Sequence, residues 1–176
     1  MVAQAYLEDV RHQFHGQKSL AEKALAQVAD EQFFAALDGE SNSLALIVKH
    51  IAGNLKSRWT DFYTSDGEKP DRRRDSEFVA EAGDTRASLM ERWEQGWGTL
   101  FGVIDPMGVS DLERTVTIRE EPHSVLKAVN RQLAHYAYHV GQIVFLAKHN
   151  AAGRWQSLTI PRGQSETFNA RKRSKA

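Results

Sequence analysis

The stretch NRQLAHYAYHVGQIVFLAKH, residues 130–149, bears on both the fold and the chemistry of the chain. Its apolar residues recur every three or four positions, which is the period of a helix with one buried face. Within it, His135 and His139 stand four residues apart. In a helix, such residues lie about 40° apart around the axis and about 6 Å along it. Both imidazoles can therefore aim at one point beside the helix.

The same periodicity recurs along the chain and predicts four long helices. They are expected at residues 2–29, 42–63, 84–105 and 122–153. Ser41 or Asn42 is a suitable N-cap for the second helix. The sequence thus predicts an all-α fold, a four-helix bundle with a long crossover between its second and third helices.

The segments between these helices differ in length and character. Residues 64–83, TSDGEKPDRRRDSEFVAEAG, are long enough to cross the bundle and to hold one short helix. We interpret the three arginines at 72–74 as part of a solvated loop. Residues 114–124, RTVTIREEPHS, alternate in polarity and predict a small strand or hairpin.

Composition limits the classes of function. The length of 176 residues suits one domain, expected over residues 1–168, with a basic and disordered tail at 169–176. The 23 lysines and arginines balance 23 aspartates and glutamates, so no general attraction to nucleic acid or anionic membrane is expected. The chain shows neither a signal peptide nor a membrane span, which predicts a cytoplasmic protein.

The chain contains no cysteine. This excludes disulfides, thiolate metal ligands and a thiol nucleophile carried by the protein itself. A metal ion bound by the histidine pair would need at least one further ligand from elsewhere in the chain. His50 has the right helical phase, on the shoulder of the apolar stripe of its helix. The remaining histidines are expected on the surface, in a loop or cap, or too far along the last helix: His12, His15, His123 and His149.

Spacing alone leaves two interpretations of these three histidines open. They can be separate core-edge residues, each satisfied by a hydrogen bond. They can also share a divalent cation, which would remove the repulsion between protonated rings. Three imidazoles without a carboxylate suit zinc, nickel or iron(II), and also copper. Three protein ligands leave coordination positions open, as in catalytic sites.

Helical phase suggests four residues that line the same site. Asn54 and Arg58 follow His50 by four and eight positions, and Arg131 and Gln142 flank the histidine pair. An arginine here can hold an anionic substrate or a carboxylate of a thiol. Asn54 and Gln142 can instead orient the ligand imidazoles. For each of the four, an ordinary residue at the core boundary is the competing interpretation.

These residues carry a resemblance to a known superfamily. One histidine in the second helix, a long crossover and the motif AHYAYHVGQI in the fourth resemble the DinB-like (DNA-damage-inducible protein B, YfiT-like) predicted metalloenzymes. Residues 114–149 and the segment WQSLTIPRGQSETFN, residues 155–169, are similar to one uncharacterised branch. The resemblance covers nearly the whole chain except the basic tail.

The resemblance implies a bundle in an up-down-down-up arrangement. It also implies a divalent metal ion held by three histidines, which correspond to His50, His135 and His139. Members of the superfamily are typically dimers, and characterised relatives use thiols such as bacillithiol, mycothiol or glutathione in S-transfer or isomerisation. Nothing in the chain resembles a DNA-binding motif.

The expected function is therefore a metal-dependent transfer of a low-molecular-weight thiol to an electrophilic acceptor by a homodimer. One alternative is a metal-dependent hydrolase. It needs a general acid or base, and the sequence suggests only Asp61, at some distance from the site. The other alternative is a non-catalytic dimeric bundle that a metal ion stabilises.

Overall fold

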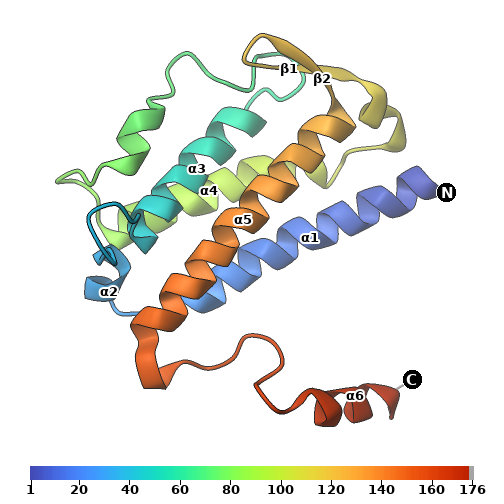
Figure 1. Cartoon of the computed structure of the whole chain (residues 1–176). Helices are drawn as coiled ribbons and strands as arrows, with labels where there is room; N and C mark the ends of the chain where they lie inside the picture. Colours follow the sequence, from blue (N-terminus) through green and yellow to red (C-terminus); the bar gives the residue numbers. More distant parts are fainter. Residues whose placement is uncertain (175–176) are drawn as a thin grey trace.

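A computed structural model describes residues 1–174 of the chain (Figure 1). These residues are mostly helical, as the sequence predicts, and include one two-stranded sheet. The long helices are α1 (Val2–Leu25), α3 (Leu44–Trp59), α4 (Arg86–Ile104) and α5 (Val125–Ala151). The shorter elements are α2 (Asp30–Phe34), η1 (Arg74–Phe78), η2 (Val109–Glu113), β1 (Thr115–Ile118), β2 (Glu121–Ser124), η3 (Ala152–Arg154) and α6 (Ser165–Arg173). No helix within residues 1–174 combines the length and apolarity that a membrane span requires.

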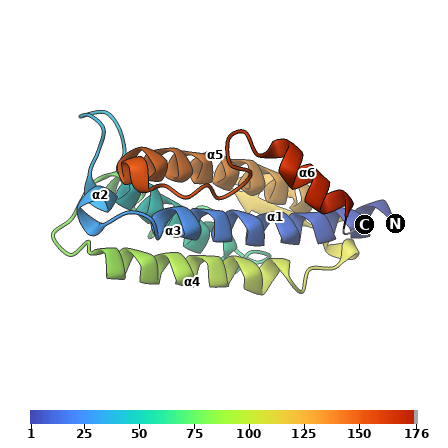
Figure 2. The ribbon, with the colours of Figure 1, turned by 90° about the horizontal axis from the view of Figure 1, so that it is seen from below.

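The four long helices lie side by side (Figures 1 and 2). α3 packs on α4, α1 packs on α5, and α3 also contacts α5. α3 and α4 run in the same direction, opposite to α1 and α5 (Figure 1). One buried aromatic residue from each helix meets at the centre of the core: Phe14, Trp59, Trp97 and Tyr136. Offset and edge-to-face contacts of this kind add to the free energy of burying the rings.

The helix boundaries differ from the predicted ones where local backbone chemistry overrides periodicity. Ser43, and not Ser41 or Asn42, caps α3: its hydroxyl accepts the N–H of Leu46 at 3.3 Å. α3 ends at Trp59 and not at residue 63, and Asp61 just beyond it has a φ of 49°.

The first predicted helix ends earlier than expected, at residue 25 and not at 29, and a short helix that was not predicted follows it. α1 ends at Leu25, and the five-residue α2 follows after a turn. Periodicity cannot reveal so short a helix, because five residues cover barely more than one turn. Gln32 of α2 donates a hydrogen bond to the carbonyl of Asn150 at 2.7 Å, which ties α2 to the end of α5.

The predicted hairpin is confirmed. β1 and β2 pair antiparallel, with Val116 opposite His123, so α5 begins at Val125 and not at residue 122. His123 was expected in a loop or cap, but it is buried on β2. The two-residue turn has positive φ at Arg119 and Glu120, the conformation that suits the twist of a tight hairpin.

The crossover between α3 and α4 is fixed at both ends. Near its start, the carboxylate of Asp66 accepts the backbone N–H groups of Arg119 and Glu120, each at 2.8 Å. Near its end, the buried ammonium of Lys49 on α3 contacts Glu81 at 3.0 Å and Asp84 at 2.7 Å. The crossover is therefore attached to the hairpin near its start and to α3 near its end.

The tail also differs from the prediction. Disorder was expected at 169–176, whereas the structure continues α6 to Arg173. The segment contains good helix formers, and its basic residues cluster in the last turn, where they suit the helix dipole. α6 buries none of its side chains. Residues 175–176 lie outside the described part of the chain.

The close approach of α3 and α4 predicts a strong effect at Gly96. A Cβ there would lie 2.9 Å from Cβ of Leu55, inside normal contact distance. Gly96→Ala should therefore lower the free energy of unfolding by about 1–3 kcal/mol, measured by urea denaturation. The control is Gly98→Ala on the same helix, where a Cβ meets nothing within 4 Å. It should stabilise the protein by about 0.5–1 kcal/mol; equal effects of the two variants would contradict this packing.

Candidate metal centre

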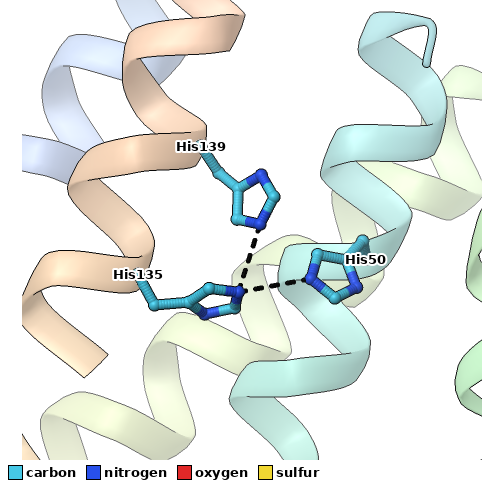
Figure 3. A group of neighbouring side chains, drawn as sticks. All are labelled: His50, His135 and His139. Atoms are coloured by element: carbon cyan, nitrogen blue, oxygen red, sulfur yellow. Dashed lines mark hydrogen bonds between the residues drawn. The ribbon is translucent and has the colours of Figure 1, made fainter. Parts of the chain in front are cut away.

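Three histidines from two helices meet at one point between α3 and α5 (Figure 3). Nε2 of His135 lies 3.4 Å from Nε2 of His50 and 3.1 Å from Nε2 of His139. One ring nitrogen from each residue can be chosen so that all three lie within 4.8 Å of one another. His50 is buried, and the other two are half-buried. The predicted convergence of His50 with the histidine pair is confirmed.

The spacing fits a shared metal ion. Two nitrogens bound to one tetrahedral ion at about 2.0–2.1 Å lie about 3.3 Å apart. Two of the three nitrogen–nitrogen distances, 3.1 and 3.4 Å, bracket this value, and the third lies within 4.8 Å. The three imidazoles therefore have the geometry and the chemistry to hold a divalent cation.

The outer nitrogens of two rings have partners that fix their orientation. Nδ1 of His50 donates to the carboxylate of Glu77 at 2.8 Å, and Nδ1 of His139 donates to Oε1 of Gln142 at 2.8 Å. A proton on Nδ1 leaves the Nε2 lone pair of each ring directed at the cluster. Gln142 thus orients an imidazole, which is one of the roles that the sequence suggested for it.

Hydrogen bonding alone does not satisfy the centre. Nε2 of His135 can carry one proton, yet it contacts the lone pairs of both His50 and His139. Its Nδ1 is buried and has no hydrogen-bond partner among the described residues. A cation between the three Nε2 atoms would satisfy every lone pair that converges there.

Glu77 is a site residue that the sequence analysis missed. It lies in η1 within the crossover and is buried, with 7% of its surface exposed. Besides His50, its carboxylate binds Arg72 in a bidentate pair, with Nε to Oε1 and Nη2 to Oε2 both at 2.9 Å. The expectation of no carboxylate at the site other than a distant Asp61 is therefore wrong. The side chain of Arg72 is only 5% exposed, although residues 72–74 were interpreted as a solvated loop; Arg73 and Arg74 are exposed.

Gly53 on α3 makes room for this carboxylate. A Cβ at that position would lie 2.7 Å from Cδ of Glu77, closer than real Cβ contacts allow. Gly53 follows His50 by one helical turn, so the same face of α3 provides a ring and the space for its partner. The glycine is required here by the close approach of the crossover.

Electrostatics keep Glu77 ionised. Burial raises the pKa of its carboxyl, but the hydrogen bonds from His50 and Arg72 outweigh burial, and the net shift is downward. The ionised carboxylate is an acceptor only, so it holds the Nδ1 proton of His50 in place.

The histidines on α5 are held in the neutral state. Burial, followed by the charges of His139 and His50, lowers the pKa of His135 to about 3. Burial also lowers the pKa of His139. Neutral imidazole is the form that binds metal ions, so neither ring must lose a proton before it can act as a ligand.

The other predicted lining residues are distributed around one pocket. Asn54, Arg58 and Arg131 line a pocket of about 170 Å³ beside His50 and His135. Asn54 does not orient an imidazole as one prediction had it, since its Oδ1 accepts the hydroxyl of Tyr136 at 3.0 Å. Arg58 is buried and donates to Glu68 at 3.0 Å.

Three further arginines line this pocket and were not predicted. Arg72 and Arg74 come from the crossover, and Arg119 comes from the hairpin turn. Helical phase carries no information on such segments, so their convergence with α3 and α5 could not be predicted from periodicity.

Comparisons with known proteins identify a family whose function is unknown. A family model described as "Protein of unknown function (DUF1572)" matches residues 1–164. The three histidines, Glu77 and the arginines of the pocket all lie within the matched range. No curated protein matches the chain.

The low pKa of His135 predicts that the metal-free protein loses stability as the pH falls. In the unfolded chain the ring is protonated below about pH 6.5, whereas in the folded chain it stays neutral down to about pH 3. The unfolded state therefore binds more protons in this window, and the free energy of unfolding falls from pH 6.5 downward. Urea denaturation of chelator-treated protein between pH 7 and pH 5 measures the effect. His135→Gln should flatten the dependence, and His149→Ala should not; equal slopes in all three proteins would contradict it.

Proposed function

The chain belongs to the DUF1572 family of proteins of unknown function, and we propose that it is a divalent-metal-binding transferase of low-molecular-weight thiols. The observation that carries the proposal is the convergence of three imidazole nitrogens beside an open, arginine-lined pocket. The proposal includes the fold: the four long helices form the up-down-down-up bundle of the DinB-like superfamily, which the order of the histidines resembles.

Zinc, nickel or iron(II) fits the donor set of His50, His135 and His139. Three protein ligands leave at least one coordination position for another molecule, which is typical of catalytic centres. A bound ion would supply Lewis acidity, which lowers the pKa of a coordinated thiol or water towards neutrality. The pocket beside His50 and His135 gives such a molecule a place to bind.

The residues of the chain hold the centre rigid. Glu77 fixes the ring of His50, and Gln142 fixes the ring of His139. Outer partners of this kind determine the tautomer and the orientation of ligand imidazoles. The chain has no cysteine, so the thiol must arrive with the substrate. The protein would bind the thiol and the electrophilic acceptor and orient them for reaction.

Glu77 also bears on the hydrolase alternative. Hydrolysis by an activated water needs a group that can accept a proton. Both oxygens of Glu77 are occupied by His50 and Arg72, and its pKa is lowered. The carboxylate at the rings is therefore a poor general base, which favours thiol transfer over hydrolysis.

A homodimer remains part of the proposal. Tyr138 and Phe145 lie seven residues apart on α5, and more than 60% of the surface of each is exposed. Residues at this spacing share one face of a helix. This outer face of α5, next to the histidine pair, is a candidate for contact with a second copy of the chain.

The centre predicts that His135→Ala removes both the metal ion and thiol transfer. The variant retains two of three ligands, which cannot replace the lost imidazole. Metal content is measured by elemental analysis of protein purified without a histidine tag, and turnover by a screen of thiols against electrophilic acceptors. His149→Ala, on the exposed face of the same helix, is the control and should retain both properties.

Different results would exclude different parts of this proposal. An unchanged metal stoichiometry in His135→Ala would show that the three histidines are not the ligands. A metal-loaded protein without turnover for any thiol would contradict the transferase. Ester or amide hydrolysis without added thiol would favour the hydrolase instead. A melting temperature that falls on chelation, with no turnover at all, would indicate a metal-stabilised structural bundle.

The bond between Glu77 and His50 predicts a graded loss of affinity. Glu77→Gln removes the charge that holds the Nδ1 proton of His50, so metal affinity should fall by roughly 10–100-fold. Competition with a chromophoric chelator measures it. Asp75→Asn, an exposed position in the same short helix η1, should leave the affinity unchanged. Equal affinities of Glu77→Gln and the wild type would show that Glu77 does not support the centre.

A further inference from the structure

Five arginines line the pocket beside the histidines. Three come from the crossover and the hairpin turn, and two from the helices that carry the histidines. The lining consists of His50, Asn54, Arg58, Arg72, Arg74, Arg119, Arg131, Gln132 and His135. No carboxylate belongs to this lining. Guanidinium groups that converge on one small space repel each other unless anions lie among them.

The carboxylates around the pocket do not balance these charges. Glu68 is shared by three guanidinium groups, those of Arg58, Arg72 and Arg119. Glu77 binds Arg72 as well, and the fully exposed Asp75 lies 3.9 Å from Arg74. Arg131 forms no ion pair with any residue between 1 and 174. The pocket therefore carries an excess of positive charge.

Two side-chain nitrogens of Arg58, a residue that lines the pocket, also have no partner. Nε and Nη1 of Arg58 form no hydrogen bond among the described residues, although only 4% of the Arg58 surface is exposed. Burial lowers the pKa of this guanidinium, as expected for a charge that its counter-charge does not fully satisfy. Buried polar groups are rarely left in this state unless a water, an ion or a ligand completes them.

We infer that this pocket binds an oxyanion, a carboxylate or a phosphate group, of the molecule that reacts at the histidines. Guanidinium groups match both oxyanions because they donate two parallel hydrogen bonds. Excess positive charge disfavours a cationic ligand, and unpaired buried donors disfavour an apolar one. The assignment of the reacting molecule as an anionic thiol rests on the proposed function, but the oxyanion site itself does not.

The helices set the distance between the two ends of this molecule. On α5, Arg131 precedes His135 by one turn; on α3, Arg58 follows His50 by two turns. α3 and α5 run in opposite directions, so both arginines lie on the same side of the histidines (Figure 1). The separation is about 6 Å along α5 and about 12 Å along α3. One small molecule with a thiol at one end and an oxyanion at the other can span it.

Calorimetric titration of the full chain tests the inference with three probes. Inorganic phosphate should bind to the metal-free protein, and more weakly as salt is added. With zinc loaded, 3-mercaptopropionate should bind roughly tenfold more tightly than 2-mercaptoethanol, which has a thiol but no charge. If phosphate binds and this preference is absent, the site holds a free anion and not a group of the thiol, which overturns the link to the histidines.

Variants locate the site. Arg131→Gln should reduce phosphate affinity roughly tenfold and abolish most of the preference for 3-mercaptopropionate, since Arg131 is exposed and its loss spares the core. Arg58→Gln should reduce phosphate affinity by more than tenfold. Because Arg58 is buried, circular dichroism checks whether this variant folds. If it does not fold, the test rests on Arg131→Gln. Arg154→Gln, exposed beyond α5, is the control and should bind as the wild type does.

Two results separate the site from the transferase. Phosphate that does not bind, or that binds equally to the wild type and Arg131→Gln, overturns the oxyanion site. Phosphate binding that is lost in Arg131→Gln but kept in Arg154→Gln supports the site. That support holds even where no thiol gives turnover, because binding to the metal-free protein requires no reaction.

Discussion

The hydroxyl of Tyr136 fixes the position of α5 along the axis of α3. The convergence of the three histidines depends on that position. The hydroxyl accepts the indole N–H of Trp59 and donates to Asn54, each at 3.0 Å. Burial raises the pKa of this hydroxyl, so it keeps the proton that it donates. Since Tyr136 is the neighbour of His135, the bonds that align the two helices also bring the rings of His135 and His50 together.

The crossover contributes side chains to the site that the long helices do not provide. Its short helix η1 brings Glu77 against His50, and its arginines form one wall of the pocket. Lys49 and Asp66 hold the crossover at its two ends, so Glu77 is part of a fixed segment. Rigid support of ligand side chains is what distinguishes a preformed metal centre from histidines that lie near each other by chance.

The sequence predicted the parts of the molecule that follow a period. Apolar repeats located the long helices, and helical phase selected His50 as the partner of the pair on α5. Periodicity did not locate α2, Ser43 as the cap of α3, or the strand that replaces the expected first turn of α5. Glu77 and Arg119 reach the site from the short helix of the crossover and from a hairpin turn, where side-chain direction depends on tertiary contacts and not on spacing.

The histidines and two of the pocket arginines lie on different parts of the fold, and this separation has an evolutionary consequence. The proposed metal ligands lie on α3 and α5, whereas Arg72 and Arg74 lie on a connection that contributes little to the hydrophobic core. Insertions and substitutions are tolerated better in connections than in packed helices. If the proposed ion is bound, relatives whose crossovers differ in length or charge should therefore keep the three histidines but accept different molecules, so that selectivity diverges while the helices that carry the histidines stay the same.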